Sequence, residues 1–113
     1  MEQLIVAKEF SVTPGVRYPD EGPFSGQEFR KKFLLPKLKK AIDAGVNLLI
    51  DFDGSAGYGS SFLEESFGGL IREEGMSYET INKILEFKSD EDPSIIDEVK
   101  QYMREAHDYK QTH

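Results

Sequence analysis

The sequence predicts an α/β fold in which a mixed sheet packs against helices, all within a single domain. Three observations lead to this prediction. The chain has 113 residues, which is enough for one compact core. Short apolar segments alternate with longer amphipathic ones, in the order strand, helix, strand, helix, strand, helix. Glycine and proline clusters separate these segments, as is typical of loops between elements.

The first third of the chain predicts a strand, a loop and a long helix. Residues 4–10 begin with aliphatic, β-branched side chains and predict a strand, and residues 16–18 predict a second, brief one. Ser25 and the glutamate three residues later form a capping box, which is typical of a helix start. Pro36 falls inside this helix and should kink or split it, and Gly45 should end it.

The middle of the chain predicts a buried strand followed by a second helix. Residues 46–52 are the most apolar segment and suit a central strand covered on both faces. A glycine-rich loop over residues 53–59 leads into a helix over residues 60 to 75, with a capping box at Ser61. The pair Gly68-Gly69 costs up to about 1 kcal/mol per residue against alanine, which suggests close approach of a neighbouring element, expected to be the sheet or a partner.

The last third predicts a helical turn, a strand and a closing helix. Residues 77–82 form the turn, residues 84–88 the strand, and Asp92-Pro93 the N-cap and first position of the helix. The domain is expected over residues 1–107, with residues 108–113 as a frayed polar tail.

The composition argues against several classes of function. The chain has no cysteine, which removes disulfides, thiolate metal sites and cysteine nucleophiles. Its net charge of -7 argues against sequence-independent binding to nucleic acid or an anionic membrane. His107 and His113 are too poorly placed for a metal pair, and no apolar run or basic N-terminal segment predicts a membrane span or a secretory signal. We therefore expect a cytoplasmic, single-domain protein with no metal and no cofactor.

One short motif predicts an enzymatic alternative. The apolar strand ends in Asp51-Phe52-Asp53-Gly54-Ser55, which resembles the first motif of haloacid-dehalogenase-type phosphatases. In that family the first aspartate attacks phosphorus, the second is an acid/base, and magnesium lies between them. The same chemistry also needs a lysine on a later strand and a further acidic cluster. The alternative function is therefore a small magnesium-dependent phosphatase.

The same segment resembles the centre of the STAS domain of bacterial anti-sigma factor antagonists. Residues 48–63 align without a gap with an apolar strand, a short turn and the start of the following helix, and Ser60 falls on the phosphorylated serine of that family. Gly59 stands where STAS domains have an aspartate, and Phe62 stands where they have a glycine. The resemblance supports the fold and partner binding more strongly than it supports phosphorylation.

The closer resemblance is to a divergent relative, the bacterial STAS-like domain of unknown function. It rests on Arg17-Tyr18, on Ser25-Gly26-Gln27-Glu28-Phe29-Arg30 and on the run from Ser60 to Leu70. This resemblance extends from about residue 4 to residue 106 and implies a single STAS-like domain, with a mixed sheet of four to five strands packed against three main helices.

The resemblance implies a non-enzymatic regulatory module that binds a protein, such as a histidine-kinase-like ATPase. The candidate partner-binding residues are Tyr58, Gly59, Ser60, Phe62 and Glu65, and the candidate phosphorylation sites are Ser60 and Ser61. Two alternatives stay open at this point. Ser60 and Ser61 can act only as helix caps, and Phe62 can lie in the core.

Overall fold

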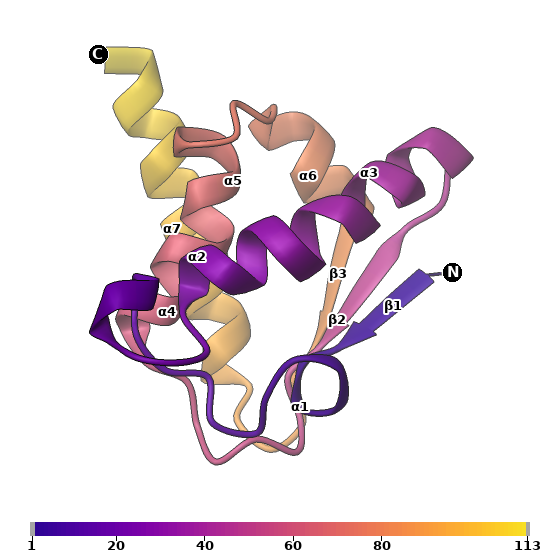
Figure 1. The fold of residues 1–113 in the computed structure, drawn as a ribbon. Helices are drawn as coiled ribbons and strands as arrows, with labels where there is room; N and C mark the ends of the chain where they lie inside the picture. Colours follow the sequence, from indigo (N-terminus) through magenta and orange to yellow (C-terminus); the bar gives the residue numbers. More distant parts are fainter. Residues whose placement is uncertain (1, 113) are drawn as a thin grey trace.

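A three-stranded parallel sheet forms the framework of the computed structural model, which describes residues 2–112 (Figure 1). The strands β1 (Glu2–Ile5), β2 (Leu48–Asp51) and β3 (Leu85–Lys88) follow one another in the order β1-β2-β3. The prediction of an α/β domain is confirmed, whereas a mixed sheet of four to five strands is wrong for the described residues.

Helices connect the strands and follow the last one. Between β1 and β2 lie the short α1 (Val6–Glu9), the 3₁₀ turn η1 (Pro19–Glu21) and a long helix made of α2 (Gly26–Phe29), the π-helical segment η2 (Arg30–Leu34) and α3 (Leu35–Ala44). Between β2 and β3 lie a second long helix made of α4 (Ser60–Leu63), the π-helical segment η3 (Glu64–Gly68) and α5 (Gly69–Arg72), and then α6 (Tyr78–Ile84). The helix α7 (Ser94–Thr112) closes the described chain and includes residues 108–112, which were expected as a frayed tail.

The missing strand has a local cause. Residues 16–18 form no ladder, because their carbonyls are used by the start of the first long helix. The amide of Gly26 donates to the carbonyl of Val16 at 2.8 Å, and the amide of Gln27 donates to that of Arg17 at 3.1 Å. These bonds fix the segment against α2 instead of against the sheet.

The predicted helix signals are confirmed in the first long helix and only partly in the second. The Ser25 hydroxyl accepts the amide of Glu28 at 3.1 Å, and Gly45 ends α3 with a left-handed φ of 69°. The break expected at Pro36 is a π-helical turn just before it, a common way to absorb an irregularity in a helix. The capping box at Ser61 is wrong, since the N-cap of α4 is Gly59 and no side chain caps it.

Only one face of the sheet is covered by helices. Leu4 and Ile50 lie side by side in the ladder and are fully buried, as is Leu48. On the opposite face Leu49 is only half-buried, and its neighbour Glu86 is exposed. The expectation that the central strand is covered on both faces is therefore wrong. Within the described part of the chain, no helix combines the length and the apolarity that crossing a membrane requires.

Candidate functional site

The loop before α4 lies against a second loop from the N-terminal third of the chain. The amide of Ala56 donates to the carbonyl of Val12 at 2.7 Å. A Cβ placed on Gly59 would lie only 3.3 Å from the carbonyl oxygen of Gly15, so the two backbones are in close contact there. Figure 1 shows the two loops running side by side below the helices. Residues 11–24 and 53–59 thus form one continuous surface, which we call the loop surface.

The loop surface carries exposed apolar side chains. Val12 is 53% exposed and Phe24 is 39% exposed. Phe24 also has a positive φ of 59°, which is unusual for a bulky residue and costs on the order of 1–3 kcal/mol. Its ring packs edge-on against Phe10, with 5.7 Å between centroids. The backbone therefore holds this phenylalanine at the surface in a conformation that local preferences disfavour.

Three of the sequence-predicted site residues lie on this surface or directly after it and are accessible. Gly59, Ser60 and Ser61 are exposed at the start of α4. Tyr58 is half-buried, because its hydroxyl donates to the carbonyl of Phe52 at 2.8 Å and its ring packs against that of Phe52. Burial raises the pKa of the Tyr58 phenol to about 12. Tyr58 thus ties the loop to the end of β2, and only part of its ring can meet a partner.

Two of the predicted partner-binding residues are inaccessible, so the prediction of a surface role is wrong for both. Phe62 is 0% exposed and packs against Phe29 and Phe10 with centroid distances of 5.5 and 6.0 Å. Glu65 is 2% exposed and is fully engaged by arginines. The amphipathic pattern of the helix carries Phe62 inward together with Leu63 and Phe67.

Ser60 lies next to the closing helix. The hydroxyl of Tyr102 in α7 interacts with the side chain of Ser60 and donates to the carboxylate of Glu98 at 2.7 Å. Burial and the neighbouring carboxylates raise the pKa of Tyr102, while the contact with Ser60 acts in the opposite direction. A charge added to Ser60 would therefore lie near the carboxylate of Glu98 and beside a hydroxyl whose proton is already donated to that carboxylate.

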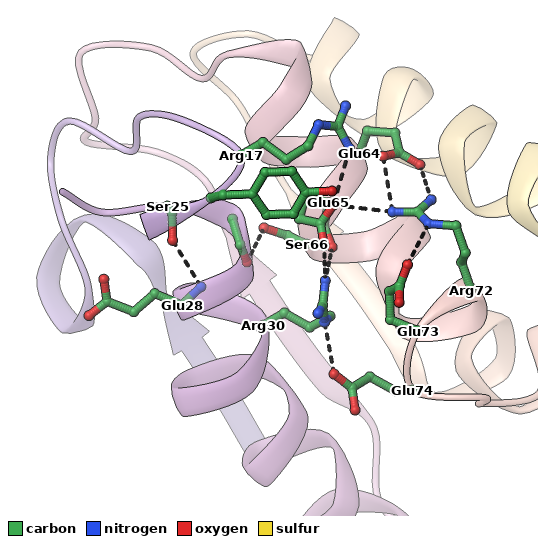
Figure 2. Close-up of polar contacts among 12 residues, drawn as sticks. Arg17, Ser25, Glu28, Arg30, Glu64, Glu65, Ser66, Arg72, Glu73 and Glu74 are labelled. Carbon is green, nitrogen blue, oxygen red and sulfur yellow. Dashed lines mark hydrogen bonds and ion pairs between the residues drawn. The ribbon is translucent and has the colours of Figure 1, made fainter. Parts of the chain in front are cut away.

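Beside this surface lies a buried ion pair that connects the two long helices (Figure 2). Arg30 is 1% exposed, and its Nη1 donates to the carboxylate and to the backbone carbonyl of Glu65, at 2.5 and 2.8 Å. Its Nε donates to Glu74 at 2.9 Å. A Cβ on Gly69 would lie 2.3 Å from the same Nη1. The guanidinium thus occupies the space that a side chain at the second glycine of the pair would need.

The outer part of this network is formed by two half-exposed arginines. Arg17 and Arg72 both bind Glu64, and they reach Glu65 at 3.1 and 3.2 Å. Burial would raise the pKa of the Glu64 carboxyl, but hydrogen bonds from Arg72 and Arg17 outweigh it and hold the pKa below its ordinary value. In the described residues every buried side-chain nitrogen and oxygen has a partner, which is typical of structural networks.

Sequence analysis missed this network, although two signals for it were present. Arg30 directly follows a core phenylalanine, and the glycine pair predicted a close neighbour, which was expected to be the sheet or a partner. The prediction of a close approach is confirmed at Gly69, where the neighbour is a side chain of the first long helix.

The aspartates of the phosphatase motif lie at the carboxyl end of the sheet. Asp51 is paired in register with Lys88 of β3, and the Nζ of Lys88 binds Asp53 at 2.6 Å. Asp53 also accepts the amides of Asp90 and Glu91, so hydrogen bonds and Lys88 hold its pKa below the ordinary value. Among residues 2–112, no group of three or more His, Cys, Asp or Glu side chains is arranged to hold a metal ion.

The described chain is thus a small α/β domain whose two long helices are locked together beside an exposed loop surface. The chain belongs to the family of STAS-like domains of unknown function, whose model matches residues 25–94. The matched region begins at the capping residue Ser25 and includes Arg30, Ser60 and the glycine pair. This confirms the resemblance found in the sequence. No curated protein and no solved structure matched the chain.

Proposed function

We propose that the protein is a non-catalytic regulatory module that binds another protein through the loop surface and the start of α4. The observation that carries this proposal is the strained, exposed Phe24, which lies with the exposed Val12 on the loop surface, while the exposed Ser60 directly follows that surface. Contiguous exposed apolar side chains are typical of interaction sites. Backbone strain is retained where the surrounding structure enforces it, and it is common at functional sites.

The partner that fits the resemblance to anti-sigma factor antagonists is a histidine-kinase-like ATPase. Membership in the STAS-like family supports a regulatory interaction module in general terms. The ATPase as partner and the control by phosphorylation go further. They rest on the alignment of Ser60 with the phosphorylated serine of STAS domains. The protein is proposed to act in the bacterial cytoplasm.

Phosphorylation of Ser60 would change this surface without unfolding the domain. A phosphate adds a charge of about -1.5 to -2 at neutral pH. Ser60 is exposed, so solvent would screen most of the repulsion from Glu98, to which Tyr102 already donates its hydroxyl proton. A partner that covers this serine with apolar side chains would have to desolvate the new charge, which can cost several kcal/mol.

The test compares three forms of the protein as ligands for a purified histidine-kinase-like ATPase from the same source organism, with Mg-ATP present. Wild type is expected to bind and to incorporate phosphate, and Ser60→Ala to bind without incorporation. Ser60→Asp is expected to bind at least tenfold more weakly. Ser77→Asp is the matched control, because Ser77 is also an exposed serine at the start of a helix but lies at α6. Equal binding of wild type and Ser60→Asp would contradict the proposal.

The magnesium-dependent phosphatase is the second candidate, and the position of Lys88 favours it. That chemistry needs a lysine on a later strand, and Lys88 of β3 lies 2.6 Å from the second aspartate. Asp53, however, is already held by this lysine and by two backbone amides. We expect no turnover of a generic phosphomonoester with magnesium. Turnover that Asp51→Asn abolishes would instead establish the phosphatase.

A further inference from the structure

The two outer edges of the sheet are treated differently by the chain. At the β1 edge, the carbonyl of Gln3 accepts the Nζ of Lys37 at 2.8 Å, and the amide of Ile5 donates to the carboxylate of Glu9 at 2.7 Å. Lys37 and Glu9 also form an ion pair with each other at 2.7 Å. Charged side chains thus occupy the backbone groups that another strand would need, which is a known way to protect an edge.

The β3 edge has no such protection. The carbonyl of Lys88 accepts the amide of Phe52 at 2.8 Å, so Lys88 directs its backbone groups toward the central strand. Successive residues of a strand direct these groups to opposite sides, and Phe87 therefore directs its N–H and C=O away from the sheet. No hydrogen bond from another residue of the described chain reaches either group. A hollow of about 470 Å³ lies along this edge, with Ile96 and Lys100 of α7 on its other side.

We propose that β3 pairs with β3 of a second copy of this chain, antiparallel and about a twofold axis at Phe87. The two three-stranded sheets would then join into one continuous sheet. This surface is separate from the loop surface, and the proposal does not rest on the proposed function.

The first argument for a second copy is that the free backbone groups complement themselves. In an antiparallel pair, two opposed residues can exchange both of their N–H···O bonds. Phe87 offers one free donor and one free acceptor on the same side, so it can pair in this way with Phe87 of the partner subunit. The half-buried rings of both phenylalanines would also meet on the helix-covered side of the sheet.

The second argument is charge complementarity. With the axis at Phe87, Glu86 stands opposite Lys88 of the partner subunit, and Lys88 stands opposite Glu86 of the partner subunit. Side chains of alternate residues share one face, so each opposed pair lies together on the open face of the sheet. Glu86 and Lys88 have neighbours in the same chain, namely Asn47 at 2.6 Å and Asp53 at 2.6 Å. Lys88 also pairs with Asp90 at 3.2 Å, and its side chain is still 43% exposed.

The proposed dimer is expected to be weak and dependent on concentration, because β3 has only four residues. A foreign extended peptide could use the same backbone groups, but it would match the charges only if it carried the same order of glutamate and lysine. The order of charges along β3 therefore favours a second copy as the occupant.

The test uses two charge reversals and their mixture, followed by sedimentation equilibrium over a range of concentrations. Wild type is expected to approach twice its mass of 12.8 kDa as the concentration rises. Glu86→Lys gives a strand with two lysines and Lys88→Glu a strand with two glutamates, so each variant alone is expected to stay monomeric. An equimolar mixture is expected to form a heterodimer, because the opposed charges are then complementary.

The mixture also controls for folding, since an unfolded variant could not recover the dimer. Lys40→Glu changes an exposed lysine of α3 and is expected to dimerise as wild type does. The proposal would be overturned if wild type stayed monomeric at every concentration. The β3 edge would then be either empty or the binding site of a foreign strand. A wild-type dimer that neither reversal weakens, or a mixture that stays monomeric, would overturn it as well.

Discussion

The substitution Gly69→Ala tests why the second long helix contains two adjacent glycines. Alanine is the better helix former, and in an open helix the exchange would stabilise the protein by about 1 kcal/mol. Here the added methyl group would lie 2.3 Å from Nη1 of Arg30 and 3.1 Å from its Cδ and Cζ. The guanidinium would have to leave its position between Glu65 and Glu74.

The expected loss of stability follows from the contacts that would be strained. Overpacking a well-packed interior costs about 1–3 kcal/mol. Breaking a buried ion pair outright costs about 3–5 kcal/mol, and Arg30 is 1% exposed while Glu65 is 2% exposed. A partial displacement of Arg30 offset by the gain in helix propensity gives a net loss of about 2–3 kcal/mol, which is a large share of the stability of a small domain.

Urea unfolding of a double-mutant cycle can isolate this contact. Arg30→Met removes the guanidinium and leaves a flexible side chain with no hydrogen bonds to maintain. In that background Gly69→Ala is expected to be neutral or stabilising by up to about 1 kcal/mol. If Gly69→Ala destabilises the protein equally in both backgrounds, the guanidinium is not the reason for the glycine.

Three further predictions concern single contacts. Hydrogen bonds hold the pKa of the Glu64 carboxyl below its ordinary value, so the contribution of this carboxylate to stability is complete above pH 4.5 and is lost as the pH falls further. Glu64→Gln should therefore be less stable than wild type at neutral pH, and thermal melts of the two should converge in acid. Burial raises the pKa of Tyr58 from 10 to about 12, so stability should fall as the pH rises through this range in wild type and less in Tyr58→Phe. Lys37→Met frees the carbonyl of Gln3 at the β1 edge and should increase aggregation measured by light scattering.

Features with a local cause could be predicted from the sequence. The cap at Ser25 and the helix end at Gly45 each depend on residues within a few positions, and both are present as expected. The number of strands could not be predicted, because residues 16–18 have the composition of a strand but hydrogen-bond to the start of a helix. Propensity describes a segment alone, whereas pairing depends on its neighbours.

The candidate site shows the same division. The exposed Ser60 at a helix start follows from the turn before it. The burial of Phe62 follows from helical periodicity, which predicts its side of the helix better than the alignment does. The pairing of Arg30 with Glu65 joins residues 35 positions apart. No local pattern specifies such a contact, so only the fold could identify it.

Hydrogen exchange measured by mass spectrometry, with and without the bound ATPase, tests the central claim most directly. The account predicts slower exchange in residues 11–24 and in the amides from Ala56 to Phe62, and unchanged exchange in α6. Ser60→Asp should lose this protection, while Ser77→Asp should keep it. Protection confined to other elements, with residues 11–24 and 56–62 unchanged, would contradict the assignment of the loop surface as the binding site.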